Sequence, residues 1–328
     1  MWLTSSLTTA LTPTTVALGN FDGVHRGHQQ VIQPALNLAA ATVSLDLSVT
    51  QVGTTGTKAF YKTVVTFNPH PQEFFTGQAR RLLTPLDEKV LALEKLGVEQ
   101  LVLLPFDREL AALTPQAFVE TILVQQLQAK HISVGADFCF GRQRAGTAVD
   151  LEAIAALHGI ETTIVPLQTY QGERISSSTI RQALQSGDLQ TANQHLGRPY
   201  SLIGTVVQGQ QLGRTIGFPT ANLQLPEQKF IPRHGVYAVR VHLESGDHQH
   251  PLLGVMNIGN RPTLAGTHQT IEIHLRDWWG DLYGQTLIVN LEGFLRPEQK
   301  FASLEELKAQ IQVDCEAAKA ILMASANS

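Results

Sequence analysis

The feature that most constrains how this chain can fold is a change of pattern near its middle. Before it, short β-like runs alternate with helical stretches, whereas from Tyr200 onward such runs follow one another with only turn residues between them. Strands that alternate with helices are typical of a parallel sheet covered by helices, and consecutive short strands favour a closed antiparallel barrel. With 328 residues, the chain has the length of about two domains. We therefore predict one domain over residues 1–186 and a second over residues 187–328.

The expected elements follow from apolar periodicity and from turn residues. In the first domain we expect strands at Thr15–Gly19, Thr63–Phe67, Gln100–Leu104, His131–Gly135 and Glu161–Val165, and helices at 29–41, 85–96, 115–129 and 149–158. In the second we expect strands at Leu202–Gln208, Val236–Leu243, Leu252–Ile258, Thr270–Leu275 and Thr286–Leu291, and then a final helix. Pro85 and Pro115 each follow a threonine, which indicates an N-cap and then the first helical residue. The glycine- and threonine-rich segment Asp46–Lys58 indicates a surface loop.

Composition excludes several classes of protein. The chain has 43% hydrophobic and 16% charged residues, which is enough to bury a sizeable core. Its formal net charge is −4 without a long basic run, so we expect no nucleic-acid surface. Two cysteines, Cys139 and Cys315, are too few for a disulfide framework and favour a reducing compartment. The N-terminus lacks a basic segment, and no stretch approaches the ~20 apolar residues of a membrane span, so we expect a cytoplasmic protein that contacts no membrane.

The residues from Gly19 to His28 read GNFDGVHRGH and lie between the first predicted strand and helix. Glycines at such a turn expose backbone N–H groups at the positive end of the helix dipole, which makes an anion site. His25 and His28 can donate hydrogen bonds to phosphate oxygens, and Gly27 lets the backbone approach a nucleotide. The order His25-Arg26-Gly27-His28 resembles the H-x-G-H signature of nucleotidyltransferases.

Three alternatives remain for these histidines. A plain Rossmann turn is one, although the fingerprint G-x-G-x-x-G is absent. A zinc-binding pair is another, although no cysteine or third histidine lies nearby in sequence. Two surface histidines in a loop are the third.

Three further polar clusters of the first domain indicate ligand binding. Asn68-Pro69-His70 follows a strand directly, and a rigid turn is the alternative reading. Asp137-Phe138 lies in a glycine- and aromatic-rich segment at another strand end, with arginines close behind, a set that suits a flat ring beside a phosphate. The hydroxyls of Ser177–Thr179 begin a helix between Arg174 and Arg181 and offer many donors to a polyphosphate. A simple N-cap run would explain one or two hydroxyls but not the flanking arginines.

The densest motif of the second half is GRTIGFPTAN, from Gly213 to Asn222. Thr220 and Asn222 are two residues apart, so in an extended segment both side chains point the same way. Two neutral oxygens suit Mg²⁺, which takes few protein ligands and completes its shell with phosphates and water. An ordinary Thr/Asn turn is the alternative.

Two more features of the second half belong with this motif. Asn257 and Arg261 lie in a second polar turn, NIGNRPT. Glu272 lies in a strand of alternating polarity and shares one face with His274. A carboxylate in that position is either on the solvent face or lines a site.

Taken in order, these motifs resemble the bacterial bifunctional riboflavin kinase/FMN adenylyltransferases, also called FAD synthetases. The likeness runs from about Thr15 to Ala320 and includes FDRELAALTPQAF (Phe106–Phe118) and the ending between Leu295 and Asp314. It implies an α/β nucleotidyltransferase-like, Rossmann-like N-terminal domain with a parallel sheet, and a C-terminal six-stranded antiparallel β-barrel with a terminal helix. The loop at 46–60 is longer than the family pattern, and Gly209–Gly213 is less glycine-rich.

The resemblance implies two reactions. The barrel would phosphorylate riboflavin to FMN with ATP, and the first domain would then join FMN to the AMP part of a second ATP, giving FAD and pyrophosphate. Glu272 would be the general base of the first reaction, with Mg²⁺ held by Thr220 and Asn222, and His25 and His28 would act on the α-phosphate in the second. The residues implied to bind ATP or its phosphates are Gly19, Phe21, Gly23, Gly27, Ser177, Ser178, Thr179, Arg181, Gly213 and Thr220, and those implied to border flavin are Asn68, Pro69, Asp137, Phe138, Asn257 and Arg261.

Two other functions are weighed against this one. A nucleotidyltransferase for another substrate, such as pantetheine phosphate, needs no barrel with PTAN and NIGNRPT motifs. A flavin-binding regulator without catalysis needs neither the histidine pair nor the combination of Thr220, Asn222 and Glu272.

Overall fold

The computed structural model describes residues 1–45, 60–209, 213, 217–244, 250–263 and 266–324, with the backbone alone at 38–45, 261–263 and 266–268. The predicted loop at 46–58 lies outside the described residues. The chain forms two compact units, Met1–Ser176 and Ser177–Ser328. The predicted boundary after residue 186 falls instead at the end of the helix α7 (Ser177–Ser186) and stays a prediction.

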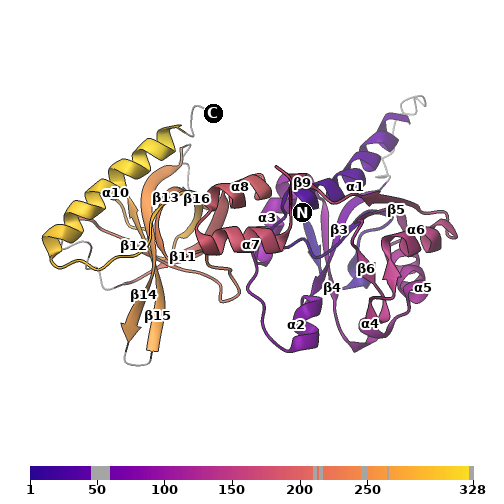
Figure 1. Ribbon diagram of the computed structural model, residues 1–328. Coiled ribbons are helices and arrows are strands. Elements are labelled where there is room, and N and C mark those ends of the chain that lie inside the picture. The colour runs from indigo at the N-terminus through magenta and orange to yellow at the C-terminus, as the bar shows by residue number, and fades with distance from the viewer. Residues whose placement is uncertain (46–59, 210–212, 214–216, 245–249, 264–265, 325–328) are drawn as a thin grey trace. The chain divides into compact units, whose positions relative to one another are not determined.

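A six-stranded parallel sheet forms the centre of the first unit (Figure 1). Its order is β1-β4-β3-β2-β5-β8. The bounds are β1 Trp2–Thr4, β2 Thr14–Leu18, β3 Tyr61–Asn68, β4 Gln100–Pro105, β5 Ala129–Gly135 and β8 Glu161–Val165. Five of these strands are the predicted ones. The sixth, β1, pairs in parallel with β4 at the edge of the sheet and was not predicted, because three residues are too short to show a period.

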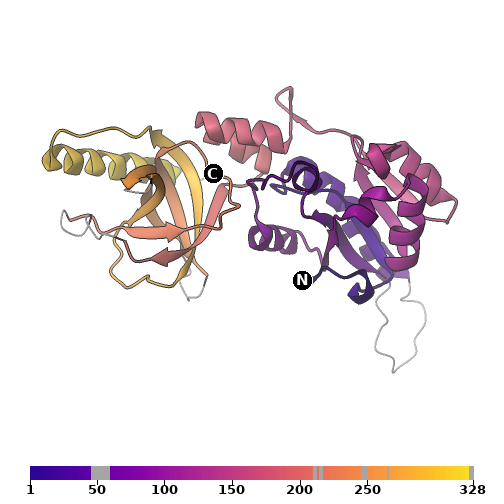
Figure 2. The same ribbon diagram turned by 90° about the horizontal axis from the view of Figure 1, so that it is seen from below.

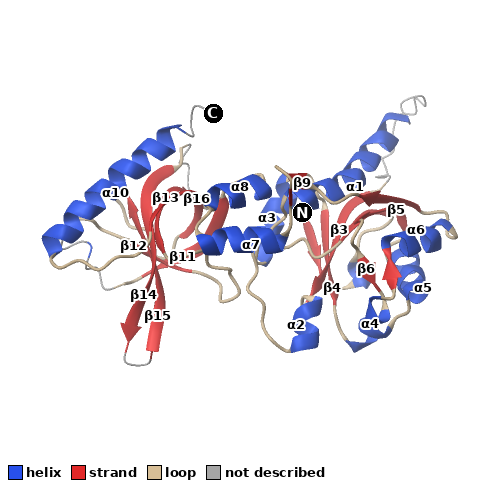
Figure 3. Cartoon of the chain, in the orientation of Figure 1, coloured by secondary structure: helices blue, strands red, loops and turns tan. Residues whose placement is uncertain are grey.

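Helices cover both faces of this sheet (Figure 3). They are α1 Arg26–Leu45, α2 Pro71–Thr76, α3 Leu86–Lys95, α4 Arg108–Ala112, α5 Pro115–Phe118 with a π-helical continuation over Val119–Gln126, and α6 Ala148–Ala156. On one face, Ile32 of α1 and Leu93 of α3 pack with alternate residues of β2, β3 and β4. On the other face, Leu123 and Leu151 pack with the remaining alternate residues. Burial on both faces explains why these strands read as nearly continuous apolar runs.

Of the two predicted N-caps, one is confirmed and one is wrong. The Thr114 hydroxyl accepts a hydrogen bond from the Ala117 N–H at 3.1 Å, with Pro115 as the first helical residue. At α3 the capping position is Pro85 itself. The Thr84 hydroxyl instead accepts a hydrogen bond from the Gly23 N–H at 2.9 Å, so it holds the glycine-rich loop rather than the helix.

The second unit contains a closed antiparallel barrel of order β11-β12-β15-β14-β13-β16, and α10 runs along its outside (Figure 2). The strands are β11 Tyr200–Val207, β12 Ala221–Gln224, β13 Gly235–Leu243, β14 Leu252–Thr263, β15 Gly266–Leu275 and β16 Thr286–Arg296, and the helices are α7, α8 Leu189–Leu196 and α10 Leu304–Ala324. The predicted fold class is therefore confirmed for both units. The sixth strand, β12, begins within the PTAN segment, at Ala221.

Candidate active sites

The loop between β2 and α1 lies at the centre of the carboxyl edge of the parallel sheet. The chain order reverses between the neighbouring strands β2 and β5, and ligands of such sheets bind at this switch point. The backbone turns through left-handed conformations at Phe21, Gly23 and Val24, with φ values of 48°, 96° and 42°. A Cβ on Gly19 would lie 3.2 Å from the Phe21 ring, so the first glycine gives the aromatic ring room to fold under the loop.

Hydrogen bonds from buried polar groups hold this loop in place. The Thr84 N–H donates a hydrogen bond to the Asp22 carboxylate at 3.2 Å, and the Lys89 ammonium donates one to the Asn20 carbonyl at 3.0 Å. Asp22 and Lys89 are 3% and 8% exposed. Burial lowers the pKa of Lys89, while the Asp22 carboxylate acts against that shift. Sequence patterns missed both residues, since a lysine on a helix is normally solvated.

His25 and His28 lie against each other at the start of α1. Their rings stack with centroids 3.5 Å apart and an interplanar angle of 14°. The His28 backbone N–H donates to Nδ1 of His25 at 3.2 Å. A neutral His25 therefore carries its proton on Nε2. The Phe21 ring meets His28 edge-on at 5.3 Å and restrains its orientation.

Gly27 packs closely on the His25 ring. A Cβ at this position would lie 3.2 Å from two atoms of that ring and 3.8 Å from the Ile175 carbonyl oxygen. Among the residues that the structure describes, no group of three His, Cys, Asp or Glu side chains could hold a metal ion. The zinc alternative for the histidine pair therefore has no third ligand of these types there.

Asn68 is the last residue of β3, beside β2, and is exposed, and Pro69 follows the strand. The next residue, His70, is the N-cap of α2, and its Nδ1 accepts the Gln72 N–H at 3.1 Å. Burial, followed by the nearby Arg80 cation, lowers the pKa of His70 to about 4. His70 therefore stays neutral at neutral pH and works as a helix cap.

Asp137 and Phe138 follow β5, on the other side of β2. The Asp137 carboxylate forms an ion pair with the Arg174 guanidinium. The Phe138 ring stacks on Phe140 at 5.8 Å, partly buried against the core. The sheet thus brings the residues after β2, β3 and β5 to neighbouring positions on one edge.

The hydroxyl-rich run belongs to the other compact unit. Ser177, Ser178, Thr179 and Arg181 lie on α7, in the unit that begins at Ser177. Arg181 donates to the Ser177 carbonyl at 3.4 Å, and its guanidinium lies 5.6 Å from the centre of the Phe230 ring. Their expected role with the phosphates of the first domain stays a prediction.

In the barrel, strand register brings three predicted residues into one row. Asn222 on β12 pairs with Glu272 on β15, and Glu272 pairs in turn with Asn257 on β14. All three are partly exposed, whereas Ile271 and Ile273 on either side of Glu272 are buried in the barrel. The carboxylate therefore lies on the outer face between two amides.

The backbones of two glycines that precede β12 lie close to Asn222 and Thr220. A Cβ on Gly209 would lie 2.1 Å from the Asn222 amide nitrogen, and one on Gly213 would lie 3.2 Å from the Thr220 hydroxyl oxygen. The two side chains predicted to bind the metal, Asn222 and Thr220, thus each lie against the backbone of a glycine. Gly209 was not among the predicted site residues, although its place at the head of the Gly209–Gly213 loop could have indicated it.

Two further contacts surround the row. Nδ1 of His274 lies 2.9 Å from the Pro219 carbonyl oxygen and links β15 to the PTAN segment. A Cβ on Gly259 would lie 2.1 Å from the Glu298 carboxylate, which places Glu298 close to Asn257. The Arg261 backbone pairs with His268 in the β14–β15 hairpin, and its side chain lies outside the described part of the chain.

The comparisons with known proteins cover both halves. The FAD synthetase family model matches residues 7–179, and the riboflavin kinase family model matches residues 196–322. The chain belongs to the bifunctional riboflavin kinase/FMN adenylyltransferase family. It is 43% identical over 300 residues to the protein of that name from Escherichia coli (strain K12), with 91% of this chain and 90% of the relative covered. The Haemophilus influenzae relative of the same name is 40% identical, with 93% of each chain covered.

A solved structure has the same fold over nearly the whole chain. It is a crystal structure titled as a macrolide-efflux protein from Streptococcus pneumoniae, with a TM-score of 0.82 and 30% identity, covering 97% of this chain and 98% of that one. Within the described ranges of the present chain, no helix is both long and apolar enough to cross a membrane.

Proposed function

We propose that this member of the family carries out both reactions in one chain. The barrel phosphorylates the ribityl 5′-hydroxyl of riboflavin with ATP, and the N-terminal unit joins FMN to the AMP part of a second ATP. FAD and pyrophosphate are the products. The observation that carries the kinase assignment is the row Asn222–Glu272–Asn257, which holds one carboxylate between two amides, with the backbone of Gly209 against one of them.

Glu272 is the general base of the kinase. The amide of Asn257 on the neighbouring strand can hydrogen-bond a ligand while the carboxylate accepts the hydroxyl proton. Neither step needs a covalent intermediate, since positioning and charge neutralisation are sufficient for phosphoryl transfer.

The residues around the PTAN segment fit Mg²⁺. The set offers two neutral oxygens, from Thr220 and Asn222, with the Glu272 carboxylate on the next strand, and this is the oxygen chemistry that Mg²⁺ prefers. Asn222 lies against the bare backbone of Gly209, and Thr220 against that of Gly213. When bound, the ion would neutralise charge on the ATP phosphates. Thr220 and Asn222 would hold it, and the loop backbone would orient the phosphate chain.

His25 and His28 act on the α-phosphate of the second ATP. The two stacked imidazoles lie at the start of α1, where the first N–H groups of the helix and its dipole favour negative charge. Donors set in place before the reaction stabilise the charge that grows on the phosphate. The loops after β3 and β5, with Asn68 and Asp137, border the space on either side of β2 and suit the flavin end of FMN.

Chromatography of one reaction mixture tests the proposal. With riboflavin, ATP and Mg²⁺, FMN should form first and FAD later. Glu272→Gln keeps shape and hydrogen bonding but removes the proton acceptor, so FMN formation should fall ~10²–10⁴-fold, while FAD formation from added FMN stays normal. Kinase turnover near that of the parent protein would reject the base role. Loss of both reactions would indicate misfolding.

A further inference from the structure

Strand pairing stops one residue short of Thr220, one of the two proposed metal ligands. β12 begins at Ala221, and its first pair with β15 joins Ala221 to Ile273. Pro219 and Thr220 lie before that pair. Pro219 has no backbone N–H, so its backbone can form a hydrogen bond only through its carbonyl oxygen. The position of the Thr220 hydroxyl therefore depends on contacts outside the ladder.

His274 supplies such a contact from the neighbouring strand. Its Nδ1 lies 2.9 Å from the Pro219 carbonyl oxygen. A carbonyl oxygen can only accept a hydrogen bond, so Nδ1 carries the proton and donates it, whether the ring is neutral or protonated. Continued by one step, the register of β12 with β15 brings Thr220 opposite His274. The imidazole thus holds the chain one residue before the metal ligand, past the end of the ladder.

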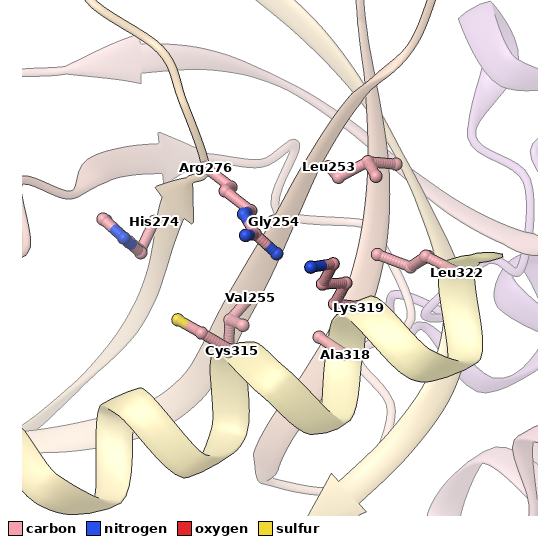
Figure 4. A pocket seen from close by; sticks show the side chains of 9 residues that line it. All are labelled: Leu253, Gly254, Val255, His274, Arg276, Cys315, Ala318, Lys319 and Leu322. Carbon is pink, nitrogen blue, oxygen red and sulfur yellow. The ribbon is translucent and has the colours of Figure 1, made fainter.

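Two neighbours restrain His274. The Phe218 ring meets the imidazole edge-on, with centroids 5.3 Å apart and an interplanar angle of 76°, and the His274 backbone pairs with Val255 of β14. Figure 4 shows the side chain on β15, at the edge of a shallow depression between β14 and α10. One ring therefore contacts both residues that precede Thr220 in the chain, Phe218 and Pro219.

The strand that carries His274 also carries the candidate base. Glu272 and His274 are both partly exposed, whereas Ile273 and Leu275, which alternate with them, are buried in the barrel. Both polar side chains therefore lie on the outer face of β15, two residues apart. This one strand thus presents the base and, two residues on, the group that holds the segment with the metal ligand.

We propose that His274 is a positioning residue of the kinase site, which holds Thr220 in place through the Pro219 carbonyl. This role rests on the proposed function, because it concerns the residues assigned there to Mg²⁺ and to proton transfer. Asn222 is paired directly with Glu272 in the ladder, whereas Thr220 lies beyond it. Loss of the imidazole hydrogen bond should therefore affect turnover and the Mg²⁺ requirement more than the binding of riboflavin.

Three variants of the full chain separate the hydrogen-bond donor from the ring. His274→Phe keeps an aromatic ring beside Phe218 but removes the N–H group. His274→Asn removes the ring but keeps an N–H donor on the atom bonded to Cγ, which is the place of Nδ1 in histidine. His242→Phe makes the same change at an exposed position of β13 and is the control for a new aromatic ring on the barrel.

The kinetic readout is the rate of FMN formation over a range of Mg²⁺ and riboflavin concentrations. His274→Phe should lower kcat about tenfold, the size of one hydrogen bond, and should raise the Mg²⁺ concentration that gives half the maximal rate, while KM for riboflavin stays close to that of the parent. His274→Asn should recover kcat to within about threefold of the parent, and His242→Phe should match the parent. FAD formation from added FMN should be unchanged in all three.

Hydrogen exchange read by peptide mass spectrometry needs neither metal nor turnover. In the protein without ligands, the backbone amides between Gly217 and Gln224 should exchange about tenfold faster in His274→Phe than in the parent, because local opening exposes them, and His274→Asn should restore the parent rate. Equal exchange and equal kcat in His274→Phe and the parent would overturn the proposal. A loss that His274→Asn does not recover would overturn it as well. A parent protein that makes no FMN would contradict the proposed function, and the exchange rates would still decide whether the imidazole holds the segment.

Discussion

Gly209→Ala tests whether the glycine loop positions the proposed metal ligand. The new Cβ would lie 2.1 Å from the Asn222 amide nitrogen, 2.5 Å from its Cγ and 2.8 Å from its Oδ1, whereas ordinary contact begins at 3.4 Å. The backbone of Gly209 is not left-handed, so alanine fits the local conformation. The Asn222 amide must then move by about 1 Å, and a misplacement of that size costs about 10²-fold in rate. FMN formation should fall by that factor and should require more Mg²⁺.

The assay is the initial rate of FMN formation from riboflavin, measured over a range of Mg²⁺ concentrations. FAD formation from added FMN, on the same preparation, controls for folding and should not change. A double-mutant cycle with Asn222→Ala isolates the mechanism, because Gly209→Ala should cost almost nothing further once the amide is absent. Additive losses in the double variant, or a single-variant rate within threefold of the parent, would refute the idea that Gly209 acts through Asn222.

Three other changes address the remaining features. His28→Ala should lower FAD formation ~10²–10³-fold while FMN still accumulates, and FAD formation within a few-fold of the parent rate would count against the H-x-G-H assignment. The pKa of His70 is lowered from 6.5 to about 4 in the folded chain. Between these pH values the unfolded chain binds a proton at His70 that the folded chain does not bind. The free energy of unfolding should therefore fall as the pH drops through this range. His70→Asn keeps an N-cap acceptor and should flatten this dependence in urea titrations. A fragment of residues 177–328 should keep kinase activity, and a folded but inactive fragment would show that the barrel depends on the first unit.

The strands of the first unit and their carboxyl edge could be predicted because burial on both faces leaves a strong apolar signal in the sequence. Gly19, His25 and His28 lie within ten residues of the chain, so local chemistry alone indicated an anion site. The hydrogen bonds that hold this loop in place could not be predicted. Lys89 and Thr84 are far from the loop in sequence, and only the parallel sheet brings them to it.

In the barrel, the sequence indicated candidate residues but not how they meet. Asn222, Asn257 and Glu272 come from three separate segments, and their row depends on the pairing of β12 with β15 and of β15 with β14. Strand pairing between distant segments is not encoded in local periodicity. The contact of Gly209 with Asn222 depends on a third pairing, that of β11 with β12, in which Val207 faces Asn222, so it could not be anticipated either.

The two sites also differ in what holds their functional groups in place. The histidines are held by a loop whose left-handed turns and tethers are independent of the period of any strand. Glu272 is held by register, since Ile271 and Ile273 must face the barrel interior for it to lie outside. A slip of one residue in β15 would turn the carboxylate into the apolar core, and the cost of burying an unpaired charge opposes it. The apolar pattern that stabilises the barrel is therefore also what sets the position of the proposed base.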